Sequence, residues 1–164
     1  MIEEELGSLY NKIAETVIDT IPEEWDKVYL YGEVIEGAQT SYFYYFPKGS
    51  EQPIYSEDII EHYTVSEEEY FQKWHRLLNY IRELREVFID EEQEPWTNFT
   101  MIFDNSGKFK IDFNYDDLTN VNSHERETIW NYKHLGIIPK SKSGKRYLEK
   151  YFEDLKTEKK VSNV

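Results

Sequence analysis

The sequence predicts an α+β fold in which helices cover one face of an antiparallel sheet of four to six strands. Segments rich in Tyr, Phe and Val lie in neighbouring pairs joined by short Gly-containing connections, which favours hairpins. Apolar residues recur at helical spacing on both sides of these pairs. The order of segments shows no repeated strand–helix–strand alternation, so an antiparallel sheet is favoured over a parallel one.

The first element is a predicted helix over residues 2–21. One apolar stripe runs along it at steps of three and four residues, formed by Ile2, Leu6, Leu9, Ile13, Val17 and Ile21. Pro22 ends the helix, because the residue before a proline disfavours the helical region. The acidic turn "PEEW" follows and contains Glu23 and Glu24.

Two aromatic strands are predicted at residues 25–35 and 40–46, joined as a hairpin by "EGAQ". The second strand places Tyr42 and Tyr44 on one face and Phe43 and Tyr45 on the other. Aromatic residues on both faces indicate a central strand or a second covered face. Residues 54–65 are ambiguous, and we expect a short edge strand followed by a turn.

The clearest helix is predicted at residues 66–90. Ser66 and Glu69 form the S-x-x-E capping-box pattern at its start. The apolar face that follows is predicted to pack on the sheet, and it comprises Tyr70, Trp74, Leu77, Leu78, Ile81, Leu84 and Phe88. In the next connection, "EPWTNF", we expect Trp96 to pack in the core where helix and sheet meet.

A second hairpin is predicted from strands at 97–104 and 108–115, joined around "NSG". One face is apolar and contains Phe99, Met101, Phe103, Phe109, Ile111, Phe113 and Tyr115. The other face carries Thr100, Ile102, Lys110, Asp112 and Asn114, which is typical of a half-buried hairpin. Two helices are then expected at residues 122–135 and 145–156, and all the helices are expected on one face of the sheet.

The net charge of −14 is large for a chain of 164 residues. Residues 139–164 hold eight Lys or Arg and four Asp or Glu, a net of +4, so residues 1–138 carry −18. An acidic body argues against binding nucleic acid phosphates or anionic membranes and suits a basic partner or simple solvation. The sequence has no cysteine, no segment long enough to span a membrane and no signal peptide, which predicts a cytoplasmic protein.

Few residue patterns point to catalysis. Asp112, Asp116 and Asp117 lie within six residues, so they could hold a divalent cation or act as acid and base, as in a metal-dependent hydrolase. An acidic surface hairpin that contacts a partner explains the same residues. His124 and Glu127 have a spacing that can ligate metal, although an ordinary helix N-terminus also explains it. The sequence contains no phosphate-binding glycine loop, and we expect neither enzyme activity nor a cofactor.

Several stretches resemble one known family. "LYNKIAETVIDTIPEEWDKVYLYGEV" is similar to the start of the YezG-like immunity proteins, antitoxins of Gram-positive bacteria, and "YFQKWHRLLNYIRELREVF" resembles their middle helix. "EPWTNFTMIFDNSGKFKIDFNYDDL" resembles their most recognisable stretch, and "YKHLGIIPKS" the segment that follows. The resemblance covers nearly the full length. One departure is the strand end "FNYDDL", which is one acid richer than the family pattern.

The resemblance implies a single immunity domain over residues 1–156, and from its terminal position we expect residues 157–164 to form a flexible tail. It also implies that the protein binds a cognate toxin in the cytoplasm of the producing cell. Toxins of this kind are polymorphic proteins exported by the type VII secretion system, such as LXG-type toxins, and they often carry a nuclease domain. The family implies no catalytic residue and no cofactor, and it transfers no toxin-contact residue to this chain.

A nuclease presents a basic cleft to nucleic acid, and an acidic body is attracted to such a cleft over long range. Tyrosines can then anchor the contact once water is excluded. We therefore expect partner binding at Asp104, Asp112, Asn114, Asp116, Asp117, Glu23, Glu24 and Tyr45. The alternatives are a metal-dependent hydrolase that uses the acidic cluster and a chaperone-like adaptor for a secreted basic protein. The sequence does not predict an oligomeric state.

Overall fold

The structure, a computed structural model, describes residues 2–162 and divides the chain into two compact units, residues 1–118 and 119–164. Within the described residues, the first unit contains two long helices, five strands, one 3-10 turn and one short helix. In chain order these are α1 (Ile2–Thr20), β1 (Trp25–Ile35), β2 (Ala38–Pro47), β3 (Ile54–Tyr55), the 3-10 turn η1 (Ser56–Asp58), α2 (Ile59–His62), α3 (Glu67–Asp90), β4 (Asn98–Asp104) and β5 (Phe109–Asn114).

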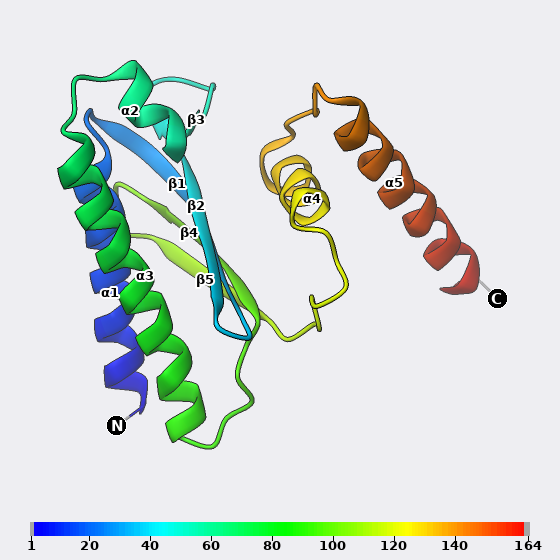
Figure 1. Ribbon diagram of the computed structural model, residues 1–164, viewed down its shortest axis with the longest axis horizontal. Helices are drawn as coiled ribbons and strands as arrows, with labels where there is room; N and C mark the ends of the chain where they lie inside the picture. Colours follow the sequence, from blue (N-terminus) through cyan, green and yellow to red (C-terminus); the bar gives the residue numbers. More distant parts are fainter. Residues whose placement is uncertain (1, 163–164) are drawn as a thin grey trace. The chain divides into compact units, whose positions relative to one another are not determined.

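The five strands form one antiparallel sheet in the order β3-β2-β1-β4-β5. The two hairpins, β1–β2 and β4–β5, join through the β1–β4 pair, and α3 connects them along the chain. Figure 1 shows α1 and α3 side by side on one face of this sheet. The predicted α+β class and antiparallel sheet are confirmed.

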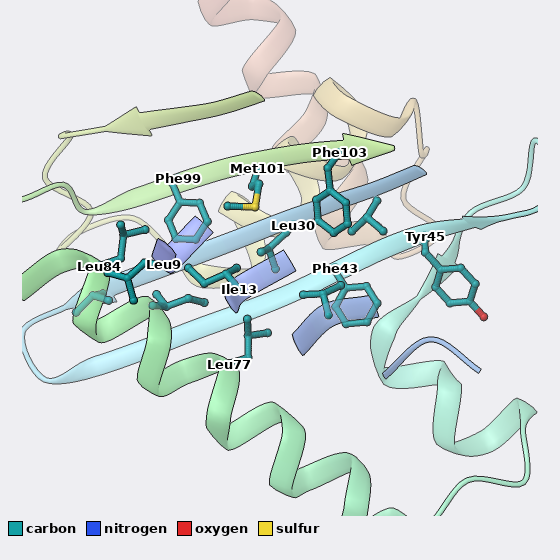
Figure 2. Packing of buried hydrophobic residues seen from close by; sticks show 14 of the residues in the cluster. Leu9, Ile13, Leu30, Phe43, Tyr45, Leu77, Leu84, Phe99, Met101 and Phe103 are labelled. Atoms are coloured by element: carbon teal, nitrogen blue, oxygen red, sulfur yellow. The ribbon is translucent and has the colours of Figure 1, made fainter. Parts of the chain in front are cut away.

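The main core lies between these two helices and the covered sheet face. Figure 2 shows Leu9 and Ile13 of α1 and Leu77 and Leu84 of α3 directed toward the sheet. Every second residue of the strands directs its side chain toward these helices. They include Leu30, Phe43, Phe99, Met101 and Phe103. Burying this apolar surface is the main stabilising contribution to the first unit.

Trp96 occupies the predicted place where the connection from α3 enters the sheet. Its side chain is fully buried, with ring centroids 5.2 Å from Phe99 and 5.8 Å from Phe113. The Arg85 side chain holds this connection by donating a 3.0 Å hydrogen bond to the Trp96 carbonyl. The core assignment of Trp96 is therefore confirmed.

The opposite face of β1, β2 and β3 is rich in tyrosine. Tyr31 stacks on Tyr42 with ring centroids 5.1 Å apart, and Tyr44 stacks on Tyr55 at 5.0 Å. Tyr42 and Tyr44 are buried although they point away from the helical layer. The two faces of β2 explain why aromatic residues occur at every position from 42 to 46, and β2 is an interior strand as expected.

Local signals set the ends of α3 and the segment before it. The Ser66 side chain accepts a hydrogen bond from the Glu69 backbone N–H, as the capping-box pattern predicts. Residues 54–65 contain the expected short edge strand β3, but η1 and α2 follow it instead of a simple turn. The fully buried Ile59 accounts for this difference, because one helical turn directs it into the core.

Strand β5 is only partly covered. Its apolar residues alternate as predicted, and Phe113 contacts Phe88 of α3 with ring centroids 5.0 Å apart. Phe109 is 51 % exposed and Tyr115 is 43 % exposed. Phe109 is the first residue of the edge strand and Tyr115 directly follows its last residue, so exposed aromatic side chains flank both ends of β5.

The second unit consists of α4 (Ser123–Leu135) and α5 (Lys142–Ser162), which pack against each other. Asn122 caps α4 by accepting hydrogen bonds from the N–H groups of His124 and Glu125, and Gly136 ends the helix in the left-handed conformation. All helices were expected on one sheet face: α1 and α3 lie there, and for α4 and α5, which form this second unit, the expectation stays a prediction. α5 continues to Ser162, beyond the predicted end at 156, and residues 163 and 164 lie outside the described residues. The flexibility of residues 157–164 stays a prediction.

Candidate partner-binding surfaces

The predicted partner-binding residues lie in two groups on the first unit. Strand register pairs Lys27 with Asp104 at one end of β4 and Asn98 with Asn114 at the other end. The first group, at the start of β1, comprises Glu23, Glu24, Tyr45 and Asp104. The second group, along and just after β5, comprises Asp112, Asn114, Asp116 and Asp117. The fold does not bring the eight residues together into one cluster.

The β5 group is the more exposed one. Asp112 projects from the sheet face opposite the helices and makes a 3.4 Å ion pair with Lys110, in which both side chains remain more than 60 % exposed. A pair this exposed adds little to stability, so its carboxylate is available for a stronger contact. Asp116 and Asp117 follow the end of the strand and are also exposed.

Asn114 shapes the chain as it leaves β5. Its side-chain oxygen accepts a 2.8 Å hydrogen bond from the Asp116 backbone N–H. The Thr97 hydroxyl donates a 2.8 Å hydrogen bond to the Asp116 carbonyl, so the turn is fastened to the start of β4. These bonds hold the backbone of Asp116 in one turn conformation. They do not involve its carboxylate, and the residue is exposed.

Asp104 organises the β4–β5 turn. Its carboxylate oxygen accepts hydrogen bonds from the Ser106 hydroxyl at 2.6 Å, the Ser106 N–H at 2.9 Å and the Lys108 N–H at 3.1 Å. The hydroxyl of Ser106, together with these backbone donors, holds the pKa of Asp104 below its usual range. Asp104 therefore stays charged, and its hydrogen bonds lie within the turn.

Glu23 and Tyr45 are bonded to each other. Tyr45 is fully buried, and its hydroxyl donates a 2.7 Å hydrogen bond to Glu23 Oε2, which also accepts from the Tyr63 hydroxyl. Burial, with the hydrogen bonds to Tyr63 and Glu23, raises the pKa of Tyr45 well above its ordinary value. In this arrangement Tyr45 ties β2 to the α1–β1 connection. Its part in partner binding stays a prediction.

Two further acids lie at the same end of the sheet. Glu24 is exposed and makes a 3.4 Å ion pair with Lys48. Asp26, which the sequence did not single out, accepts hydrogen bonds from the Gly49 N–H at 2.8 Å and from the Asn105 side chain at 3.3 Å. Asp26 thus joins the β2–β3 and β4–β5 connections at the start of β1.

An acidic groove between α1 and α3 was not predicted as a binding surface. It has a volume of about 290 Å³, and its charged lining consists of Glu5, Lys12, Glu83, Glu86 and Asp90. Acids on the outer positions of a helix usually indicate only a solvated face. The steps of three and four residues from Glu83 to Glu86 and Asp90 place them on one stripe, and this was the signal that could have identified the groove.

The described part of the chain, residues 2–162, contains no group of acids that converge as a metal site requires. Within it, no three His, Asp or Glu side chains are grouped so that they could hold a metal ion, and this includes Asp112, Asp116 and Asp117. His124 instead makes an edge-to-face contact with Tyr147, with ring centroids 5.4 Å apart. The acidic-cluster hydrolase therefore gains no support from the geometry.

A hollow of about 260 Å³ in the second unit contains polar side chains that enzymes use. His124, Lys140 and Ser141 are among its lining residues. The Ser141 hydroxyl accepts a 3.0 Å hydrogen bond from the Gly144 N–H at the start of α5. Ser141 thus serves as a helix cap, which explains its hydroxyl without a catalytic triad.

The charge divides sharply between the two units. Residues 119–164 hold ten Lys or Arg and six Asp or Glu, a net of +4, and residues 1–118 therefore carry −18. Negative charge is thus concentrated on the sheet and the two helices that cover it. Within residues 2–162, no helix is both long and apolar enough to cross a membrane.

Comparisons with known proteins agree on one family. The family model described as "Immunity protein YezG-like" matches residues 6–149. The chain is 39 % identical over 150 residues to "Immunity protein YezG" of Bacillus spizizenii, covering 90 % of this chain and 93 % of that protein. It is 38 % identical over 148 residues to the protein of the same name in Bacillus subtilis, with 89 % and 98 % covered. It is also 31 % identical over 158 residues to "Type VII secretion system protein EsaG" of Staphylococcus aureus, with 93 % and 97 % covered.

Proposed function

This chain belongs to the YezG-like immunity protein family, and we propose that it neutralises one cognate toxin, a nuclease exported by type VII secretion. Its action is to bind that toxin in the cytoplasm of the producing cell before export. Membership of an immunity family supports the antitoxin role. The nuclease, its LXG-type or related architecture and the cytoplasmic setting are the parts that we add.

The charge of the first unit is the observation that supports a nuclease as the partner. A unit with a net charge of −18 attracts a basic nucleic-acid cleft over long range and raises the rate of encounter. The same charge repels nucleic acid, so the immunity protein itself does not bind the nucleic acid that the toxin cleaves. Neutralisation then follows from occupying the basic surface.

The proposed contacts are the exposed acids of the β5 group and, at the other end of β4, Glu24. Asp116 and Asp117 lie on the turn that Asn114 and Thr97 hold in place, so binding does not require ordering a loose segment. Asp112 adds a carboxylate on the neighbouring strand. We assign Glu23, Tyr45 and Asp104 to support of this surface.

Inhibition by binding is stoichiometric and does not need turnover. The purified chain is titrated into the nuclease domain of the toxin encoded beside its gene, and DNA cleavage is measured. We expect cleavage to fall linearly with added protein and to stop at a fixed molar ratio. Complex formation is measured in parallel by size-exclusion chromatography with light scattering.

The outcomes separate the candidate functions. A complex that leaves cleavage unchanged would favour the chaperone-like adaptor. Loss of toxin activity at substoichiometric amounts of protein would favour an enzyme. Absence of both a complex and inhibition would overturn the proposed function.

A further inference from the structure

Strand β5 has an outer edge with which no strand pairs among residues 2–162. The Asp104 N–H donates to the Lys108 carbonyl at 3.0 Å, in the register that pairs Phe103 with Phe109. Hydrogen-bonded pairs alternate in an antiparallel ladder, so Lys110, Asp112 and Asn114 direct their backbone groups toward β4. The backbone N–H and C=O groups of the residues between them point away from the sheet.

Three residues therefore present this outer edge: Phe109, Ile111 and Phe113. None is fully buried, and Phe109 is 51 % exposed. Figure 2 shows the edge beyond the strand that carries Phe99 and Met101. An edge of this kind can pair with another strand unless charge or shape prevents it.

We propose that two copies of this chain pair antiparallel through the outer edges of β5, related by a two-fold axis at Ile111. Each strand then exchanges backbone hydrogen bonds at three residues, about six bonds in all. Phe109 of one copy lies opposite Phe113 of the other, and Ile111 lies opposite its own equivalent. The five strands of each copy form one sheet of about ten strands, a size that open sheets reach.

The charges on the other face select this register. With the axis at Ile111, Lys110 of each copy lies opposite Asp112 of the other, at the closely spaced non-hydrogen-bonded position. Together with the 3.4 Å pair inside each strand, the four side chains alternate in sign. Moving the axis by one residue in either direction places Lys110 opposite Lys110 or Asp112 opposite Asp112. Opposite charges directly across a ladder are favourable and like charges are not.

The apolar side of the edge adds to the same pairing. Phe109 contacts Tyr10 of α1, with ring centroids 5.5 Å apart, and the rest of its side chain is largely exposed. Pairing with a second β5 would cover the exposed part of the Phe109 ring with Phe113 of the partner copy. The net charge of −14 on each chain opposes association, and this repulsion is screened at physiological ionic strength.

The pairing concerns the free immunity protein and goes beyond the proposed function, so it is tested without toxin. Sedimentation velocity of the full chain over a concentration series is expected to show a species of twice the 19.9 kDa chain mass. Lys110→Asp places Asp opposite Asp112 at both positions and should raise the dimer Kd about tenfold or more. The reciprocal double variant, Lys110→Asp with Asp112→Lys, restores opposite charges and should restore the dimer.

Lys145→Asp is the matched control, because it makes the same charge change at an exposed position of α5 and should leave the dimer Kd unchanged. Both side chains of the Lys110–Asp112 pair are highly exposed, so the swaps should fold, which circular dichroism checks. A wild-type mass that stays at 19.9 kDa up to about 1 mM would overturn the proposal. A double variant that remains as weakened as Lys110→Asp would overturn it as well.

Discussion

The Tyr45 hydroxyl donates a 2.7 Å hydrogen bond to Glu23 Oε2, which joins the interior strand β2 to the connection between α1 and β1. Both residues were predicted as partner contacts, and the bond makes them partners of each other. The buried ring of Tyr45 also contributes to the core. The pair therefore holds the α1–β1 connection, which carries Glu23 and Glu24, against β2.

Tyr45→Phe tests the contribution of this bond to stability. The change removes a buried donor to a carboxylate and should lower the free energy of unfolding by about 1–3 kcal/mol in urea. Tyr29→Phe, on the other sheet face, is the matched control and should stay within about 0.5 kcal/mol of wild type. Equal effects of the two changes would show that the bond contributes nothing specific.

Buried tyrosines should make the protein sensitive to alkaline pH. Burial, aided by the nearby Glu57 carboxylate, raises the pKa of Tyr70 to about 12. Since an unfolded tyrosine titrates near 10, the folded state holds this proton more tightly, and the added stability is complete below about pH 10. It is lost as pH rises from about 10 through the folded pKa of about 12.

Urea unfolding from neutral pH to about pH 12 measures this loss. Tyr70→Phe also removes the 2.8 Å hydrogen bond to the Ser56 carbonyl, so slopes with pH are compared instead of absolute stabilities. The variant should lose stability less steeply than wild type above about pH 10. Parallel slopes would contradict the assignment of a raised pKa to Tyr70.

Gly32 should not tolerate a side chain. It pairs with Phe99 across β1 and β4, and a Cβ at position 32 would lie 2.4 Å from Phe99 Cε1. Gly32→Ala should therefore destabilise the protein by about 1–3 kcal/mol through overpacking. Gly7→Ala is the matched control: its Cβ meets nothing within 4 Å, and it should stabilise α1 by up to about 1 kcal/mol. A neutral Gly32→Ala, seen in thermal or urea unfolding, would disprove the close packing.

Local elements were predictable from the sequence because short-range chemistry determines them. Ser66 caps α3, and the alternation of β4 and β5 defines a hairpin, and both follow from residues within a few positions of each other. The division into two units was not predictable, because Trp130 and Leu148 on helices α4 and α5 fit a sheet-packing stripe equally well in sequence. Periodicity indicates that a face is buried without saying what buries it.

The structural placement of the candidate residues was predictable only in part, for a similar reason. Charge and alternation identified Asp112 and Asn114 on the exposed side of β5. Tyr45 and Glu23 lie 22 residues apart in the sequence, and Tyr63 lies 40 residues from Glu23. Over such separations a sequence gives no pairing signal. Non-local hydrogen bonds of this kind decide whether a tyrosine is a surface anchor or a core residue.

Charge reversal should distinguish the surfaces that meet the toxin. Asp116→Lys with Asp117→Lys is expected to reduce the toxin association rate roughly tenfold, because it reverses charge at the proposed contact. Glu153→Lys with Asp154→Lys makes the same charge change on exposed positions of α5 and should have a much smaller effect. Surface plasmon resonance measures both rates.

The groove between α1 and α3 is the competing surface. Glu83→Lys with Glu86→Lys reverses charge there without touching the β5 group. We expect this variant to bind toxin with an association rate closer to wild type than the Asp116 and Asp117 variant does. The opposite order would move the toxin contact to the groove, while leaving the immunity role intact.

The salt dependence of toxin capture tests the electrostatic account most directly. Stopped-flow association of the full chain with the cognate toxin domain is measured from low to high NaCl. If the −18 charge of the first unit drives encounter with a basic cleft, the association rate should fall by about ten- to a thousandfold across the series. An association rate that does not change with ionic strength would contradict the account.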